Sequence, residues 1–301
     1  MQKFLLNIFS QSQLDRFSAL FDSVFGKGNG IKTLTALVMV VFHFFTILID
    51  APYFPEGQEL DLSEYTLVFE DEFEGETLDT EVWNYRATGK RRGGFNSSEQ
   101  VRLENGNMIL TGQYREDGEF GPGWYAGMVN LKERYTNGYF EIRCICNDKK
   151  GYWSAFWLQA EHPYDPEISK GGIGGAEIDI MEAPDYGSGR FRHFAVQHNI
   201  HCSGMEGDTS GELNSKRLGW FYGNSIYKEY NTYGLEWTED EYIFYVNGVE
   251  TTRSTWADGV STVPEEVIVS LELPSNMDEY NYNKDTFKTE MVVDYVRIYQ
   301  K

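Results

Sequence analysis

Three carboxylates fall within the six residues EIDIME, among aliphatic side chains that are typical of a buried strand. On a helix, residues two apart point to different sides, so Glu177 and Asp179 would diverge. On a strand these two share one face, and by parity alone Glu182 would point into the core, where an unpaired charge is costly. One extra residue, a β-bulge around Ile180 and Met181, returns Glu182 to the face of the other two. The spacing therefore predicts a bulged strand with all three acids along one groove.

Such a row of acids suits the cleavage of a glycosidic bond. Three carboxylates on one face repel one another, which raises the pKa of at least one and leaves a proton shared among them. One carboxylate can then attack the anomeric carbon while a protonated one delivers its proton to the leaving oxygen. For retention of configuration the pair lies about 5–5.5 Å apart. Two other interpretations stay open: a solvated acidic strand face, and a cage for Ca²⁺ or Mg²⁺.

The composition of the whole chain restricts the partners of this groove. Its 301 residues suffice for one large β domain or two ordinary domains, and 41% hydrophobic residues predict a sizeable core. The net charge is −21, from 47 Asp and Glu against 26 Lys and Arg. Because an acidic surface repels phosphate backbones, nucleic acid is not an expected partner. A neutral ligand fits best, and a polyanion requires a local basic patch.

Cysteine is sparse in the chain. Cys144, Cys146 and Cys202 are too few for a disulfide framework. We expect them to be small buried apolar side chains, rather than a metal site or a disulfide.

The N-terminal part of the chain has the pattern of a membrane anchor. An uncharged apolar run extends from Thr33 to Ile49, with more basic than acidic residues before it and acidic residues after it. This asymmetry is typical of a single-pass anchor whose N-terminus is cytoplasmic. We predict an amphipathic cytoplasmic segment at 1–30, a transmembrane signal anchor at 31–50, a linker at 51–63 and an extracellular domain at 64–301. A cleaved signal peptide followed by secretion, and a buried core helix, are the alternatives.

Beyond residue 60 the chain consists of short β-branched and aromatic runs separated by Gly, Asn and Asp, with no long helical pattern and no internal repeat. The predicted strands fall within 65–73, 106–114, 138–147, 151–160, 176–182, 194–202, 230–238, 241–250, 265–273 and 291–300. About a dozen strands without intervening helices predict an antiparallel β-sandwich, because no βαβ crossover is available.

The motif and its surroundings resemble glycoside hydrolase family 16. EIDIME is similar to the E-x-D-x-x-E signature of that family, in the bulged form of its laminarinase-like and galactanase-like members. FEDEFEGETLDTEVWNY resembles the opening strand of the family, and GYFEIRCICNDKKGYWSAFWLQA resembles the strand pair before the active site. YNTYGLEWTEDEYIFYVNGVE and VDYVRIYQ resemble the closing strands, so that the resemblance covers about 65–300. It implies a concanavalin-like β-jelly-roll of two antiparallel sheets, an open cleft across the concave sheet, and retaining chemistry.

Matched by position, the resemblance assigns roles to the three acids and to two neighbours. Glu177 corresponds to the nucleophile, Asp179 to the assisting acid and Glu182 to the acid/base. Trp153 is placed beside the sugar bound at the nucleophile, and His201, in NIHCSG, near the leaving group.

Four further residues are expected to bind substrate or metal. Asn96, in GGFNSSEQ, matches a contact on the non-reducing side, and Trp157 either stacks on sugar or packs in the core. Arg92 belongs to GKRRGGF, a basic cluster that either recognises sulfate or carboxylate on a galactan or is a solvated loop. Asp294 matches the position of a structural Ca²⁺ ligand, and no other cofactor is expected.

The first expected function is an endo-acting, retaining hydrolase of β-1,3-glucan that works as a monomer on a polysaccharide outside the cell. A β-galactan hydrolase of the agar, porphyran or keratan type, or a transglycosylase, is the alternative. Many laminarinase-like members have a glycine pair near SLELPSNMDEYNYN, which this chain lacks, so the linkage stays open. A non-catalytic glycan-binding module is disfavoured because both catalytic glutamates are present.

Overall fold

The computed structural model describes residues 52–187 and 191–301, and within them eighteen strands form two sheets. The seven-stranded sheet has the order β13 (Asn214–Tyr222), β12 (Ala195–Cys202), β11 (Glu177–Glu182), β10 (Trp153–Gln159), β17 (Glu265–Glu272), β8 (Met128–Tyr135) and β2 (Trp83–Tyr85). The eleven-stranded sheet has the order β16 (Val249–Ser254), β15 (Tyr242–Val246), β14 (Asn231–Trp237), β9 (Gly138–Ile145), β18 (Lys288–Gln300), β6 (Met108–Arg115), β7 (Gly123–Ala126), β4 (Gly94–Asn96) and β3 (Gly89–Arg91). In that sheet β1 (Thr66–Asp71) also pairs with β18, and β5 (Val101–Leu103) with β6.

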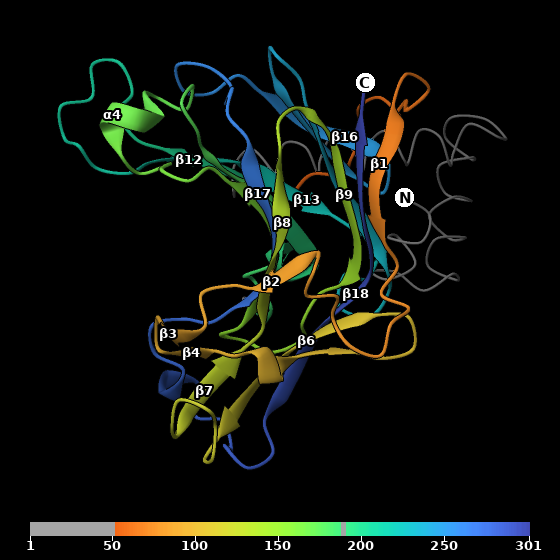
Figure 1. Cartoon of the computed structure of the whole chain (residues 1–301), viewed down its shortest axis with the longest axis vertical. Coiled ribbons are helices and arrows are strands. Elements are labelled where there is room, and N and C mark those ends of the chain that lie inside the picture. The colour runs from red at the N-terminus through yellow and green to blue at the C-terminus, as the bar shows by residue number, and fades with distance from the viewer. Residues whose placement is uncertain (1–51, 188–190) are drawn as a thin grey trace, which may run out of the picture. The chain divides into compact units, whose positions relative to one another are not determined.

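Helical structure in the described residues is short. It comprises α4 (Pro166–Ser169) and the 3₁₀ turns at Ser98–Gln100, Phe191–Phe194 and Asp278–Tyr280. Helix α4 lies in the loop between β10 and β11, and Figure 1 shows it at the upper left, well above the hairpin β3–β4 on the same side of the picture.

One hydrophobic core lies between the sheets. Phe156 and Ile178 from the seven-stranded sheet pack in the same buried cluster as Phe140 and Phe244 from the eleven-stranded sheet. Burial of each such side chain contributes about 1.5–3 kcal/mol. Because strand side chains alternate, the residues between these core positions point away from the core on the outer face of the seven-stranded sheet.

The all-β sandwich predicted from the sequence is confirmed, and all ten predicted runs contain strands. The prediction omitted the short strands β2, β3, β4, β5 and β7, and also β8 and β13. The sequences of β8 and β13, MVNLKERY and NSKRLGWFY, carry several exposed polar residues and lack a β-branched run. It also missed that β4 and β7 pair in parallel, since their pairing joins distant parts of the chain. The three cysteines are buried and free, as predicted.

The predicted linker at 51–63 needs correction over its described part, because residues 52–63 are docked on the domain. The backbone N–H of Tyr53 donates to the carbonyl of Trp220 at 2.8 Å, and that of Leu60 donates to the carbonyl of Gly248 at 2.8 Å. Leu60 and Leu62 pack on a small buried cluster of aromatic and aliphatic side chains. Backbone pairing and apolar side chains thus attach this segment to the edge strand of each sheet, β13 and β16. The compact unit begins at residue 52.

No helix within 52–187 or 191–301 has the length and apolar character needed to cross a membrane. The predicted cytoplasmic segment at 1–30 and the predicted anchor at 31–50 lie outside the described residues.

Candidate active site

The outer face of the seven-stranded sheet carries a cleft of about 990 Å³. Alternate residues of the central strands line it: Trp153, Ala155, Trp157 and Gln159 from β10, Glu177, Asp179 and Glu182 from β11, and Gln197, Asn199 and His201 from β12. Loop residues and flanking strands complete the lining with Arg86, Arg91, Arg92, Tyr164, Leu213, Ser215, Arg217 and Glu272. The cleft therefore crosses the sheet, with the three acids of β11 at its centre.

The predicted β-bulge is present in β11. Asp179 pairs with Asn199 and Glu182 with Gln197, so that three steps along β11 match two steps along β12. The same irregularity appears against β10. Ile180 and Met181, the residues at the bulge, are both buried in the core. The extra residue restores the parity of the strand, and Glu182 faces the cleft together with Glu177 and Asp179.

Glu182 accepts three hydrogen bonds from N–H donors. The indole Nε1 of Trp153 donates to Oε1 at 2.8 Å, and the side-chain amides of Gln197 and Asn199 donate to Oε2 at 3.0 and 2.6 Å. Burial raises the pKa of Glu182 above its ordinary value, although the bonds from Trp153 and Gln197 act in the opposite direction. Since a carboxylate oxygen accepts about two hydrogen bonds, Oε2 is saturated and Oε1 keeps room for a proton.

Glu177 is held differently. The amide Nε2 of Gln159 and the hydroxyl of Tyr164 both donate to its Oε2. Gln159 comes from β10, whereas Tyr164 comes from the loop between β10 and β11. Oε2 is again saturated, and Oε1 is left for other contacts. The two glutamates thus each present one unsaturated oxygen to the cleft.

Asp179 lies between them and is 5% exposed. Burial, followed by the charge of Glu182, raises its pKa well above the ordinary value, while His201 Nε2 lies 3.0 Å from its Oδ2 and opposes the rise. Burial lowers the pKa of His201, but the hydrogen bond and the charge of Asp179 outweigh this effect and the net pKa is raised. His201 Nδ1 is in turn 2.6 Å from the hydroxyl of Ser215. A histidine–aspartate pair therefore shares the proton at the centre of the cleft.

A cation cage was the alternative interpretation of the acids. Within the described residues, Glu177, Asp179 and His201 form the one group whose potential ligand atoms all lie within 4.8 Å of one another. The imidazole nitrogen and the aspartate oxygen of this group are already hydrogen-bonded to each other. Two of the three potential metal ligands are thus already bound to each other. Because hard cations such as Ca²⁺ prefer oxygen ligands, the arrangement favours a proton-sharing pair over a cation site.

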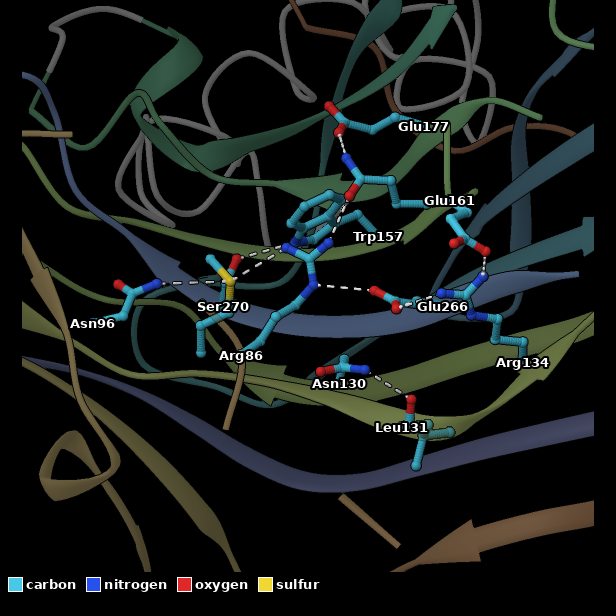
Figure 2. Close-up of polar contacts among 12 residues, drawn as sticks. Arg86, Asn96, Asn130, Leu131, Arg134, Trp157, Glu161, Glu177, Glu266 and Ser270 are labelled. Carbon is cyan, nitrogen blue, oxygen red and sulfur yellow. Dashed lines mark hydrogen bonds and ion pairs between the residues drawn. The ribbon is translucent and has the colours of Figure 1, made fainter. Parts of the chain in front are cut away.

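Of the remaining predicted substrate ligands, three line the cleft. Trp153 is half-buried and carries the guanidinium of Arg92 over its ring at 5.0 Å. Trp157 is 6% exposed, and its indole N–H donates to the Ser270 hydroxyl at 3.1 Å (Figure 2). The side chain of Arg92 is 44% exposed, with Nε 3.4 Å from a Glu272 oxygen.

Two predicted ligands lie elsewhere. Asn96 is 1% exposed, does not line the cleft, and its amide contacts the sulfur of Met128 at 3.8 Å (Figure 2). Its prediction as a substrate contact is corrected, because the side chain is turned into the protein. Asp294 forms an ion pair with Arg143, whose guanidinium lies 4.4 Å from the ring centre of Tyr230. A carboxylate that is neutralised by a guanidinium does not fit a Ca²⁺ site, so the predicted ion gains no support at Asp294.

Several cleft residues escaped the sequence analysis. Gln197 and Asn199 alternate with His201 in QHNIH, and Gln159 continues the alternation of Trp153 and Trp157, so a period-two pattern could have identified them. Tyr164 has no such signal, because it reaches Glu177 from a loop. Glu272 lies in a strand that was predicted, but its pairing with the arginines depends on tertiary contacts.

Comparisons with known proteins agree with this geometry. A family model described as "Beta-porphyranase A-D, GH16 domain" matches residues 66–301. Glucan endo-1,3-beta-glucosidase A1 of Niallia circulans is 25% identical over 78% of this chain, and Keratan-sulfate endo-1,4-beta-galactosidase of Sphingobacterium multivorum is 26% identical over 79%. The alignments span 38% and 56% of those two proteins. The crystal structure of SCLam, a non-specific endo-beta-1,3(4)-glucanase, superposes with a TM-score of 0.63 at 23% identity, over 84% of this chain and 97% of SCLam.

Proposed function

The chain belongs to glycoside hydrolase family 16, and from this premise we propose that it is a retaining, endo-acting hydrolase of a β-linked galactan that carries acidic groups. That the chain is a glycoside hydrolase follows from the family. The retaining mechanism, the roles of the acids and the sugar are the proposal. The alignment of Glu177, Asp179 and Glu182 on one face of β11 supports the mechanism, and the arginines of the cleft support the sugar.

In the proposed mechanism, Oε1 of Glu177 attacks the anomeric carbon while the bond from that carbon to the leaving oxygen breaks. The proton of Glu182 passes from Oε1 to the leaving oxygen. Water then attacks the same carbon, its proton returns to Glu182, and the bond to Glu177 breaks, so that the product keeps the β configuration. The raised pKa of Glu182 suits this role, because a general acid must hold its proton near neutral pH.

The charges in the cleft favour an anionic sugar. Apart from the three acids and His201, the ionisable side chains that line it are four arginines, one tyrosine and one glutamate, in a protein with a net charge of −21. Arg91 and Arg92 share the single carboxylate of Glu272, at 2.9 and 3.4 Å. Two guanidinium groups on one carboxylate leave one positive charge uncompensated, beside the ring of Trp153. A planar guanidinium next to a flat ring suits a sulfate or carboxylate on a sugar.

A neutral β-1,3-glucan, the first expectation from the sequence, is the second candidate. The half-buried ring of Trp153 offers a stacking platform for an uncharged sugar, and the Niallia circulans relative is named as a glucan endo-1,3-β-glucosidase. A neutral glucan has no anionic group that could pair with Arg91 and Arg92. We therefore place the glucan below the acidic galactan.

The test is a panel of polysaccharides given to the full-length protein: porphyran, the same porphyran after desulfation, agarose, keratan sulfate, laminarin and lichenan. We expect the highest kcat/KM on a sulfated galactan, about 10-fold or more above its desulfated form, since a charge-assisted hydrogen bond contributes about 1.5–3 kcal/mol. Faster cleavage of laminarin than of every galactan would instead establish the second candidate. Proton NMR of the first product gives its anomeric configuration, and an α product would contradict retention.

Arg92→Ala sharpens this test. It should lose activity on the sulfated galactan and keep it on the desulfated form. Arg253→Ala is the matched control, because Arg253 is 40% exposed, pairs with two glutamates and lies in the other sheet. Equal losses of the Arg92 variant on both substrates would remove the charge from the explanation.

A further inference from the structure

Gln159, the amide donor to Glu177, has a second partner on its other side. Nη2 of Arg86 donates to Gln159 Oε1 at 2.6 Å, while Gln159 Nε2 donates to Glu177 Oε2 (Figure 2). Arg86 follows β2 at the far edge of the seven-stranded sheet, and Gln159 ends β10. The nucleophile of the proposed mechanism is therefore connected to a guanidinium that does not touch it.

The chemistry of the two groups fixes the orientation of the amide. A side-chain amide has an accepting oxygen and a donating nitrogen that can exchange places by rotation. A guanidinium is a donor at every nitrogen and cannot accept, so Arg86 permits only the orientation in which the oxygen of Gln159 faces it. The nitrogen must then face Glu177. In the opposite orientation the amide oxygen would confront the carboxylate and repel it.

Arg86 is itself held on three sides. Its Nε lies 3.2 Å from Glu266 Oε2, its guanidinium carbon lies 5.1 Å from the ring centre of Trp157, and its Nη1 lies 3.8 Å from the sulfur of Met128. Arg134 holds the other oxygen of Glu266 at 2.9 Å (Figure 2). The Arg86 side chain is 19% exposed. A fixed fork of this kind cannot be reproduced by lysine, whose ammonium is a point charge.

Tyr164 completes the arrangement by donating to the same oxygen, Oε2 of Glu177, from the loop side. Two donors on Oε2 leave Oε1 as the oxygen that can reach an anomeric carbon. We propose that Arg86 is a positioning residue that acts through Gln159, and that Arg86, Gln159 and Tyr164 together determine which oxygen of Glu177 attacks. This inference rests on the proposed role of Glu177 as the nucleophile.

A double-mutant cycle tests it, with Arg86→Lys, Gln159→Leu and the combined variant, on the polysaccharide that the wild type cleaves fastest. Each single variant should lose about 10- to 10²-fold in kcat with KM within about threefold, because a misplaced reacting atom costs about this much. In the combined variant, kcat should fall by no more than about threefold below that of the worse single variant. Arg86→Lys already lets the Gln159 amide rotate, and Gln159→Leu already removes it, so the second change has little left to disturb. Arg253→Lys, a change of the same type at an ion-paired arginine of the other sheet, should be silent.

Three results would overturn the proposal. If Arg86→Lys raises KM and leaves kcat unchanged, Arg86 binds the substrate and does not position Glu177. Multiplicative losses in the combined variant would mean that Arg86 and Gln159 act independently. If the loss of kcat in every variant is proportional to its loss of melting temperature, Arg86 and Gln159 have a purely structural role.

Glu177→Gln, measured in parallel, separates this inference from the proposed function. An active Glu177→Gln variant removes the nucleophile assignment itself. An inactive Glu177→Gln variant together with an unimpaired Arg86→Lys variant rejects the positioning role alone.

Discussion

The two ends of strand β11 hold the same residue type in different surroundings. Glu182 is bound by three N–H groups, and all of them come from the neighbouring strands β10 and β12. Glu177 is bound by one amide from β10 and one hydroxyl from a loop. Burial raises the pKa of Glu182, as a proton donor requires. The difference teaches that the number and origin of the hydrogen-bond donors, and not the residue type, distinguish the proposed acid from the proposed nucleophile.

The two ends also differ in how rigidly they are built. Donors on paired strands are fixed by the ladder of the sheet, so the Glu182 end depends on β-sheet register alone. The Glu177 end depends on the loop that carries Tyr164 and on Arg86, which its ion pair with Glu266 holds in place. The comparison can be tested by changing one end at a time.

Glu177→Gln should have the largest effect. The amide keeps the size of the side chain but cannot form the glycosyl bond, so kcat should fall by roughly 10³-fold or more on every substrate, with binding retained. Activity is measured by release of reducing ends, and binding by calorimetry with an oligosaccharide. A variant that keeps more than a tenth of the wild-type rate would remove Glu177 from the mechanism.

Glu182→Ala should impair some substrates much more than others, whereas Glu177→Gln should impair all of them. Loss of the general acid should reduce kcat on polysaccharide by about 10²–10⁴-fold, but much less on an aryl glycoside whose leaving group needs no proton. Added azide should restore turnover with a β-glycosyl azide as product, identified by NMR. An α-azide, or equal losses on both substrates, would mean that Glu182 is not the acid.

His201→Asn should shift the pH dependence by about one unit. The positive charge of His201 lowers the pKa of both Asp179 and Glu182, so its removal lets Glu182 hold its proton to higher pH. The alkaline limb of the kcat/KM profile should therefore move upward, while the Glu177 end keeps its hydrogen bonds. A downward movement of that limb would contradict the assignment of Glu182 as the titrating acid.

Glu265→Gln should have the smallest effect on catalysis. It should act on the stability of the fold next to Glu177. Glu265 Oε1 accepts the backbone N–H of Ala176, and burial raises the Glu265 pKa to about 8 from 4.5. The folded state binds the proton more tightly, so this contribution is complete below about pH 4.5 and is lost as pH rises to about 8. Between pH 5 and pH 9 the wild type should lose roughly 8–15 °C of melting temperature relative to Glu265→Gln, since a pKa raised from 4.5 to about 8 corresponds to about 4 kcal/mol over this range and about 1 kcal/mol to 2–4 °C at this size. Parallel pH curves for the two proteins would reject the buried proton.

The catalytic strand was predictable from the sequence because its information is local. The parity of Glu177 and Asp179, together with the odd spacing to Glu182, required a bulge, and the register of β11 contains one. The same period-two pattern would have identified Gln197 and Asn199. Asn96 was misplaced because position in a motif does not determine whether a side chain turns toward the cleft or into the protein.

By itself, the sequence determined the all-β architecture and a strand with three acids on one face. Both follow from side-chain alternation along a strand, which any short window of residues records. Only the tertiary structure decided which donors reach which oxygen. Arg86, Gln159 and Glu177 are far apart in the chain and meet through sheet register, and Tyr164 arrives on a loop whose path no periodicity encodes. Local pattern thus fixes the acids, whereas the distinct chemistry of the two glutamates is created by contacts between distant segments.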